Sequence, residues 1–289
     1  MIKSFVNKFL KTLYRTLLIL VVVIFLITVI NLIKKPSLDR EWSEDSMVLP
    51  DISISDSIVE IKNLRDWRYE IGNVISKQYY DESFDSDKIK NTWLVLNPLG
   101  KWEGVAHFFF VFEFESGQSV SMSIEARREV NEKYSSLKGV LNNYELWYAW
   151  GSSADFMTRR ALFYNDDLYI YPLLISQEIS RSLFIDLAKT TEELETVPKF
   201  YNTVTSNCTN LLAKAGNNVR PGSIPFHYSR LFTGFADNQL YDLELIPHDK
   251  PFDQIFKEAR VDEQIRDIFS EKKEYSEQDF WKSIDLNNR

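Results

Sequence analysis

The sequence predicts an α+β domain with an antiparallel sheet, attached to a membrane by one N-terminal transmembrane helix. Three observations carry this prediction. An uncharged apolar segment covers residues 16–33, alternating apolar residues between positions 105 and 125 indicate a β-hairpin, and helical periodicity follows in residues 176–195 and 208–216. The remaining composition, with 44% hydrophobic and 26% charged residues in a chain of 289, is that of a globular protein.

The segment TLLILVVVIFLITVINLI, residues 16–33, has the length needed to cross the hydrocarbon core of a bilayer. Residues 17–27 are apolar on every face, which disfavours a core helix, and NLIKKPSLDREW lacks the small residues of a signal-peptide cleavage site. Basic residues flank the segment with a small excess before it: Lys3, Lys8, Lys11 and Arg15, against Lys34, Lys35 and Arg40. The positive-inside rule therefore predicts a cytoplasmic N-terminus.

These features divide the chain into five predicted segments. They are a cytoplasmic N-terminus (1–15), a transmembrane anchor (16–33), a tether (34–60), an extracytoplasmic globular domain (61–240) and an acidic helical tail (241–289). The tether is predicted because Pro36 and Pro50 stand among mixed charges without apolar periodicity. The tail contains short amphipathic helical pieces and is interpreted as accessory.

Charge and histidine spacing argue against two kinds of site. The formal net charge is −8 and no basic cluster follows Lys35, so we expect no nucleic-acid partner. The three histidines, His107, His227 and His248, stand far apart in the sequence and belong to no Cys/His ligand pattern. We therefore predict no metal and no other cofactor.

Two arms of the predicted hairpin each have one apolar face. The apolar positions are Phe108, Phe110, Phe112 and Phe114 in the first arm and Val120, Met122 and Ile124 in the second. A two-residue turn would place the phenylalanines beside Ser121 and Ser123, whereas a three-residue loop at 115–117 aligns all the apolar positions. Such loops favour a left-handed residue at their third position, where Gly117 stands.

This register also pairs polar residues on the opposite face of the hairpin. His107 falls opposite Glu125, next to the pair of Phe109 and Ser123. A carboxylate beside an imidazole can fix its tautomer and favour its protonated form. His107 and Glu125 are therefore candidates for a base and its orienting group. The alternatives are that a histidine among phenylalanines is often a core residue, and that Glu125 could instead pair with Arg127, Arg128 or another surface cation.

Cys208 is the one cysteine of the chain, so it has no intramolecular disulfide partner. TVTSNCTNLLAKAG places it at the start of a predicted helix that Ser206 or Asn207 can cap and Gly216 ends. A helix N-terminus favours the thiolate and thus a nucleophilic cysteine. The alternative is a buried cysteine that acts as a small hydrophobic residue.

His227, in GSIPFHYSRLF, is a competing base. Flanking Pro and Gly residues predict a surface loop there, which positions a side chain less rigidly than a strand does, so His107 is preferred. His107, Glu125 and Cys208 together form the set that covalent acyl chemistry requires: a base, an orienter and a nucleophile.

Four segments resemble the periplasmic domain of the Lnb-type bacterial lipoprotein N-acyltransferases, over about residues 90–235. They are VAHFFFVFEF (105–114), SIEARREVNEKYSSLKGVLNNYELWYAW (123–150), RRALFYNDDLYIYPL (159–173) and PKFYNTVTSNCTNLL (198–212). The resemblance implies a circularly permuted papain-like, or NlpC-like, fold in which the histidine strand precedes the cysteine helix. It also implies a bacterial inner-membrane protein with its C-terminal domain in the periplasm.

The same resemblance implies the chemistry of the site. Cys208 would be acylated by a membrane lipid and would pass the chain to an amine, such as the N-terminal cysteine of a diacylglyceryl lipoprotein, with His107 moving the protons. The SxEAR string supports Glu125 and makes Ser123 a neighbour that positions it. Arg127 and Asn207 are further candidates for positioning the site or binding substrate.

Two alternative functions use the same scaffold. One is a papain-like cysteine hydrolase or amidase acting on cell-wall peptides, with water as the acyl acceptor. The other is an envelope module that binds without catalysis. An apolar channel leading to Cys208 would favour a lipid donor, whereas a polar open cleft would favour a peptide.

Overall fold

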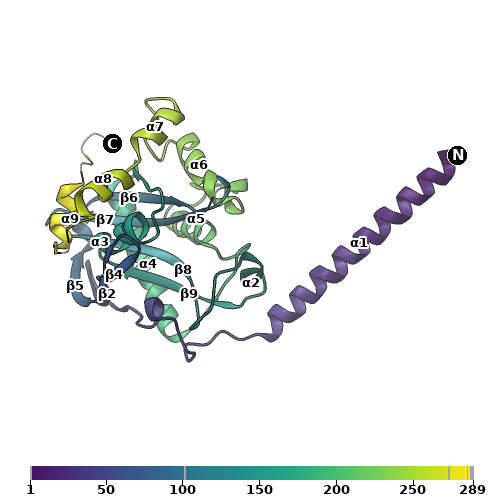
Figure 1. The fold of residues 1–289 in the computed structure, drawn as a ribbon, viewed down its shortest axis with the longest axis horizontal. Coiled ribbons are helices and arrows are strands. Elements are labelled where there is room, and N and C mark those ends of the chain that lie inside the picture. Colours follow the sequence, from purple (N-terminus) through teal and green to yellow (C-terminus); the bar gives the residue numbers. More distant parts are fainter. Residues whose placement is uncertain (1, 101, 273, 285, 287–289) are drawn as a thin grey trace.

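The computed structural model describes residues 2–100, 102–272, 274–284 and 286. Its first helix, α1 (Ile2–Ile33), projects away from the domain, and its residues 6–26 are exposed (Figure 1). Within the described part of the chain, it is the one helix long and apolar enough to cross a membrane, over Val6–Ile33. The predicted apolar helix is therefore present, and it continues toward the N-terminus beyond residue 16.

The end of α1 is tied to the domain by polar contacts near α2 (Ser136–Val140). The Asn31 side chain donates to the Val140 carbonyl at 3.0 Å, and Lys34 Nζ donates to the Leu141 carbonyl at 2.5 Å and to Asn143. The anchor thus leaves the domain beside α2.

The domain is built on a nine-stranded, mostly antiparallel sheet, which confirms the predicted α+β class. The main order is β1-β2-β9-β8-β7-β6-β10, while β5 pairs with β2 and β11 pairs with β9. The bounds are β1 (Asp51–Ser55), β2 (Ile58–Arg65), β5 (Tyr79–Asp85), β6 (Ile89–Pro98), β7 (Ala106–Phe114), β8 (Ser119–Arg127), β9 (Tyr144–Gly151), β10 (Tyr169–Pro172) and β11 (Phe200–Tyr201). A separate hairpin joins β3 (Arg68–Glu70) and β4 (Asn73–Ser76).

The hairpin of β7 and β8 has the predicted register. The pairs run from Phe109 with Ser123 to Glu113 with Ser119, and the Phe114 N–H donates to the Gln118 carbonyl at 2.9 Å, which closes a three-residue loop at 115–117. Gly117 has φ +81°, the left-handed conformation that the third loop position requires. Burial decides the register, because a shift by one residue would place the phenylalanines of β7 beside the polar residues of β8.

Helices cover both faces of the sheet. The even-numbered hairpin residues, such as Phe110 and Phe112, pack with α4 (Gln177–Thr196), α5 (Cys208–Val219) and α6 (Ala236–Asp242). The odd-numbered residues Phe109 and Val111 pack on the other face with α3 (Ser153–Thr158), the π-helical turn η3 (Arg159–Phe163), α8 (Asp262–Phe269) and α9 (Glu277–Ser283). The site described below lies where β7, β8 and α5 meet.

The structure corrects the predicted extent of the tether and the predicted role of the tail. The tether at 34–60 contains β1 and the beginning of β2, whose pairing buries Ile52 and Val59. The tail at 241–289 is helical as predicted, with α7 (Phe252–Glu258), α8 and α9, but it is not an accessory. Ile265 and Phe280 of this tail are fully buried against the face of the sheet that carries Phe109. The helices before the tail leave part of this face uncovered, and the tail covers it.

Candidate active site

His107 and Glu125 face each other across the splaying end of the hairpin. The pairing of β7 with β8 ends at Phe109 and Ser123, so the side chains of His107 and Glu125 lie just beyond the last pair. His107 Nε2 lies 3.0 Å from Glu125 Oε1. The Ser123 hydroxyl donates to the same carboxylate oxygen at 2.8 Å and lies 2.7 Å from His107 Nε2. The Nε2–H group of His107 therefore donates to Ser123 and Glu125, and Nδ1 is the ring nitrogen left for the thiol.

Cys208 is the first residue of α5 and is buried against β7. Asn207 caps the helix as predicted, because its side chain accepts the backbone N–H of Asn210 at 2.8 Å. The thiol forms hydrogen bonds with the His107 side chain and with the backbone of Phe108. Nucleophile and base are thus brought into contact by the helix start and the strand.

The electrostatics of the pair favour a thiolate beside an imidazolium. Burial alone raises the pKa of Cys208, but the hydrogen bond and charge of His107 outweigh it, so this pKa lies below its ordinary value. Burial alone lowers the pKa of His107, but the Glu125 carboxylate and the hydrogen bond to Cys208 raise it to about 9. Burial opposes ionisation of Glu125, yet the His107 charge holds the pKa of this carboxyl well below its usual range.

The alkylation rate of Cys208 tests this charge distribution. In the wild-type protein, the rate with iodoacetamide should rise with pH at a midpoint below the ordinary thiol pKa, since the thiolate forms early beside His107. In His107→Ala, the midpoint should move to higher pH, because burial then acts without the compensating charge. Equal midpoints in the two proteins would show that His107 does not lower the pKa of Cys208.

Arg160 is a site residue that the sequence prediction missed. Its guanidinium lies 3.2 Å from Glu125 Oε1, 2.9 Å from the Phe156 carbonyl and 4.6 Å from the centre of the Phe109 ring. The side chain is 7% exposed and comes from η3, where a π-helical turn directs it toward β8. Glu125 therefore pairs with His107 and Arg160, and the alternative of pairing with Arg127 or Arg128 is wrong.

Arg160 is expected to position Glu125. Arg160→Met should slow Cys208 alkylation at neutral pH by about tenfold, because Glu125 loses a partner that holds its carboxylate in place and keeps it ionised. Arg160→Lys should recover part of the rate. The matched control is Arg159→Met, since Arg159 pairs instead with Asp45 at 2.5 Å. An unchanged rate in Arg160→Met would contradict the positioning role.

The other predicted neighbours divide into two groups. Ser123 is fully buried between His107 and Glu125, and Asn207 holds the helix start by donating to the carbonyls of Thr203 and Arg230 at 2.9 and 2.8 Å. Arg127 is not brought to the thiol. Its guanidinium donates to the carbonyls of Ser46 and Met47 and lies 3.9 Å from the Trp42 ring centre, so it secures the chain that follows the anchor.

His227 lies in a turn, as predicted, and its interactions are local. Its Nδ1 accepts the backbone N–H of Ser229 at 3.3 Å, and its ring lies 3.9 Å from that of Tyr228. Among the residues that the structure describes, no three His, Cys, Asp or Glu side chains are grouped so as to hold a metal ion.

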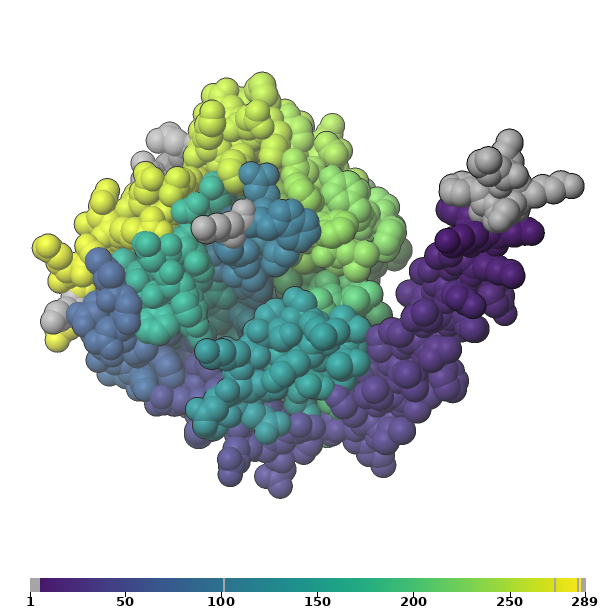
Figure 2. All heavy atoms as spheres, turned by 45° about the vertical axis from the view of Figure 1, so that its right-hand side comes forward, coloured from purple at the N-terminus to yellow at the C-terminus, as the bar shows by residue number. Residues whose placement is uncertain are grey.

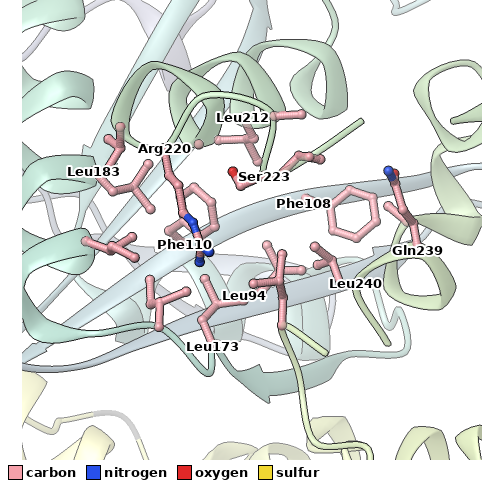
Figure 3. Close-up of a pocket in the computed structure, with 18 of the residues that line it drawn as sticks. Leu94, Phe108, Phe110, Leu173, Leu183, Leu212, Arg220, Ser223, Gln239 and Leu240 are labelled. Carbon is pink, nitrogen blue, oxygen red and sulfur yellow. The ribbon is translucent and has the colours of Figure 1, made fainter. Parts of the chain in front are cut away.

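An apolar cavity of about 110 Å³ is lined by Phe108 and Thr209, which are neighbours of Cys208. It lies between the sheet and helices α4, α5 and α6, and its lining includes Leu94, Phe108, Phe110, Leu183, Leu212, Ala213, Ile224 and Leu240 (Figure 3). Thr209, the residue after Cys208, also lines it, and Thr209 Oγ1 lies 4.0 Å from the sulfur. Arg220 is the one charged side chain among its described lining residues and lies near Phe110 in Figure 3.

The comparison with protein families covers this whole site. Residues 76–234, more than half of the chain, match the family described as the Lnb N-terminal periplasmic domain. The chain belongs to this family. The match includes His107, Glu125, Arg160 and Cys208, and together with α1 it supports a membrane protein of the Lnb family whose domain is periplasmic. Comparisons with curated proteins and with solved structures find no match.

Proposed function

We propose that this protein is a membrane-anchored acyltransferase that takes an acyl chain from a membrane lipid through a thioester on Cys208 and transfers it to an amine. The observation that carries the proposal is the apolar cavity lined by Thr209 and Phe108, two of the residues that contact the thiol. A lipid acyl chain fits an apolar lining, whereas a cell-wall peptide calls for hydrogen-bonding groups that this cavity has in small number.

The first half of the proposed reaction forms the thioester. The Cys208 thiolate attacks the carbonyl carbon of the lipid ester, and the oxyanion is stabilised by backbone N–H groups at the start of α5. The carbon–oxygen bond of the ester then breaks, and the His107 imidazolium gives its proton to the departing alcohol oxygen. The products are the acyl-thioester and a lysolipid.

The second half transfers the chain. A neutral amine attacks the thioester carbonyl carbon while the now neutral His107 takes a proton from the nitrogen. The carbon–sulfur bond breaks, which leaves an amide and restores the Cys208 thiolate beside the His107 imidazolium. Glu125, held by Ser123 and Arg160, keeps the ring oriented and stabilises its positive charge in both halves.

We further propose that α1 lies in the inner membrane and that the acceptor is the N-terminal amine of a lipoprotein. The family match and the anchor support this proposal, since donor and acceptor would then share one bilayer with the enzyme. The test uses the full chain in vesicles with a diacylglyceryl lipopeptide. Appearance of an amide-linked acyl chain on the peptide supports transfer. Release of free fatty acid without amide formation would instead establish a hydrolase.

The size of the cavity should set the preference for acyl chain length. Ala213→Phe is expected to reduce acylation from a long-chain donor by at least tenfold, because the added ring occupies the space beside Phe108 and Leu212. Turnover of an acetyl ester should be retained. Asn218→Phe, which adds the same ring on the exposed side of α5, is the control and should leave both rates unchanged.

If Ala213→Phe reduces acetyl and long-chain turnover equally, the cavity does not bind the acyl chain. Retained alkylation of Cys208 shows that the variant has folded.

A further inference from the structure

Two loops beside the site together form an exposed apolar surface, which we term the rim patch. Its residues are Leu99, Trp102 and Val105 from the loop between β6 and β7, and Phe226, Leu231 and Phe232 from the loop after α5. Trp102 is 56% exposed and Phe226 is 83% exposed. Large apolar side chains at this exposure are costly in water, so a surface of six of them indicates a binding partner.

The rim patch is one fixed surface, because the two loops are bonded to each other. The Thr233 hydroxyl donates to the Ala106 carbonyl at 2.7 Å and accepts the Ala106 N–H at 2.9 Å. The backbone N–H of Gly234 donates to the Gly104 carbonyl at 3.2 Å. The rings of Trp102 and Phe232 lie 5.6 Å apart, edge to face.

The patch borders the thiol and the cavity. The first loop leads directly into β7, two residues before His107. The second loop supplies the Arg230 carbonyl that binds the Asn207 side chain at the start of the Cys208 helix. Ser223 and Ile224, which precede Phe226, line the apolar cavity. A molecule that covers the rim patch therefore lies at the entrance to the site.

The charge of this part of the chain fits an anionic surface. Residues 196–236, which include the second loop, contain no Asp or Glu in a protein whose formal net charge is −8, while the first loop carries one carboxylate, Glu103. They contain Lys199, Lys214, Arg220 and Arg230; the first three are exposed, and Lys199 pairs with Glu193. Apolar and aromatic side chains with nearby basic residues are typical of surfaces that enter the interface of an anionic bilayer.

The anchor places this surface near a bilayer. In Figure 1, α1 projects from the side of the domain on which α2, α5 and α6 lie, and α6 directly follows the second loop of the rim patch. In Figure 2, the segments near residues 100 and 230 are neighbours on the face turned toward the reader. Short contacts from Asn31 and Lys34 to the α2 region limit how far the domain can move from the membrane.

We propose that the rim patch inserts into the bilayer as a second membrane contact, separate from α1, and holds the entrance of the site at the lipid surface. Its occupant is an anionic lipid bilayer. This docking goes beyond the proposed acyl transfer and does not require it, because it depends on exposed side chains of the two loops alone. In the proposed reaction it would give a lipid chain a path into the cavity without crossing water.

The test exploits the single cysteine of the chain. A Cys208→Ser protein is catalytically silent in the proposed reaction and accepts one new label site, so docking is measured independently of activity. The full chain carrying Phe226→Cys, labelled with a polarity-sensitive fluorophore, is reconstituted in vesicles containing phosphatidylglycerol and nitroxide-bearing lipids. The matched control is Ile71→Cys, at a side chain 72% exposed in the turn between β3 and β4, a hairpin that packs with α3 and η3 on the other face of the sheet from α5.

The label at position 226 should shift to shorter emission wavelength and be quenched several-fold more than the label at position 71. Adding Trp102→Ser and Phe232→Ser should reduce that quenching by at least half, while the thermal unfolding midpoint confirms that the protein remains folded. Water-like emission at position 226, or equal quenching at the two positions, would overturn the proposal and would assign the patch to a protein partner instead.

Discussion

Cys208→Ala is expected to abolish acyl transfer, with a loss of at least about 10⁴-fold. In the proposed reaction both half-reactions pass through the sulfur, and the position after it in α5, Thr209, offers a hydroxyl without the His107 contact that activates the thiol. The measurement is the rate of amide-linked acylation of a diacylglyceryl lipopeptide by the full chain in vesicles.

Leu211→Ala is the matched control for this variant, since it shortens a half-buried side chain of the same helix, outside the lining of the cavity, and leaves the thiol in place. It should retain most of the activity. Replacing Cys208 removes a small buried side chain from the core, so the unfolding midpoint of each variant is measured beside the rate. Substantial transfer by a folded Cys208→Ala protein would exclude covalent catalysis at this position.

His107→Ala is expected to reduce acyl transfer by about 10²- to 10⁴-fold. The variant lacks both the charge that lowers the pKa of Cys208 and the group that protonates the departing alcohol. Raising the pH should recover part of the thioester-forming step, because hydroxide then generates the thiolate without the imidazole. The measurement is the pH dependence of transfer between pH 6 and 10.

His227→Ala is the control that separates the two candidate bases. Its ring contacts Tyr228 and its Nδ1 binds the Ser229 N–H, so its removal should alter transfer by less than about twofold. If His227→Ala loses as much activity as His107→Ala, the assignment of the base to β7 is wrong.

Local patterns were enough to predict the core of the site. Alternation of Phe108 to Phe114 with Val120 to Ile124 fixes the hairpin register, and the register alone brings His107 opposite Glu125. Asn207 before Cys208 predicts the helix start, because capping side chains act on the next few residues. Both inferences concern groups close in sequence or joined by one turn, where geometry leaves few alternatives.

Long-range packing was not predictable in the same way. Arg160 lies 35 residues from Glu125 and reaches it through a π-helical turn, a feature without a pattern in the sequence. The adjacent Arg159 pairs instead with Asp45. The sequence alone therefore does not indicate which of the two arginines belongs to the site. The apolar positions of residues 262–284 indicate amphipathic helices but not the sheet face that they cover.

The most direct test of the central claim is mass spectrometry of the protein after incubation with vesicles of one defined acyl composition, without an amine acceptor. We expect the peptide that contains Cys208 to gain the mass of one acyl chain, to lose it on treatment with neutral hydroxylamine, and to remain unmodified in Cys208→Ala. An unmodified Cys208 in a protein that still acylates the lipopeptide would contradict the thioester mechanism.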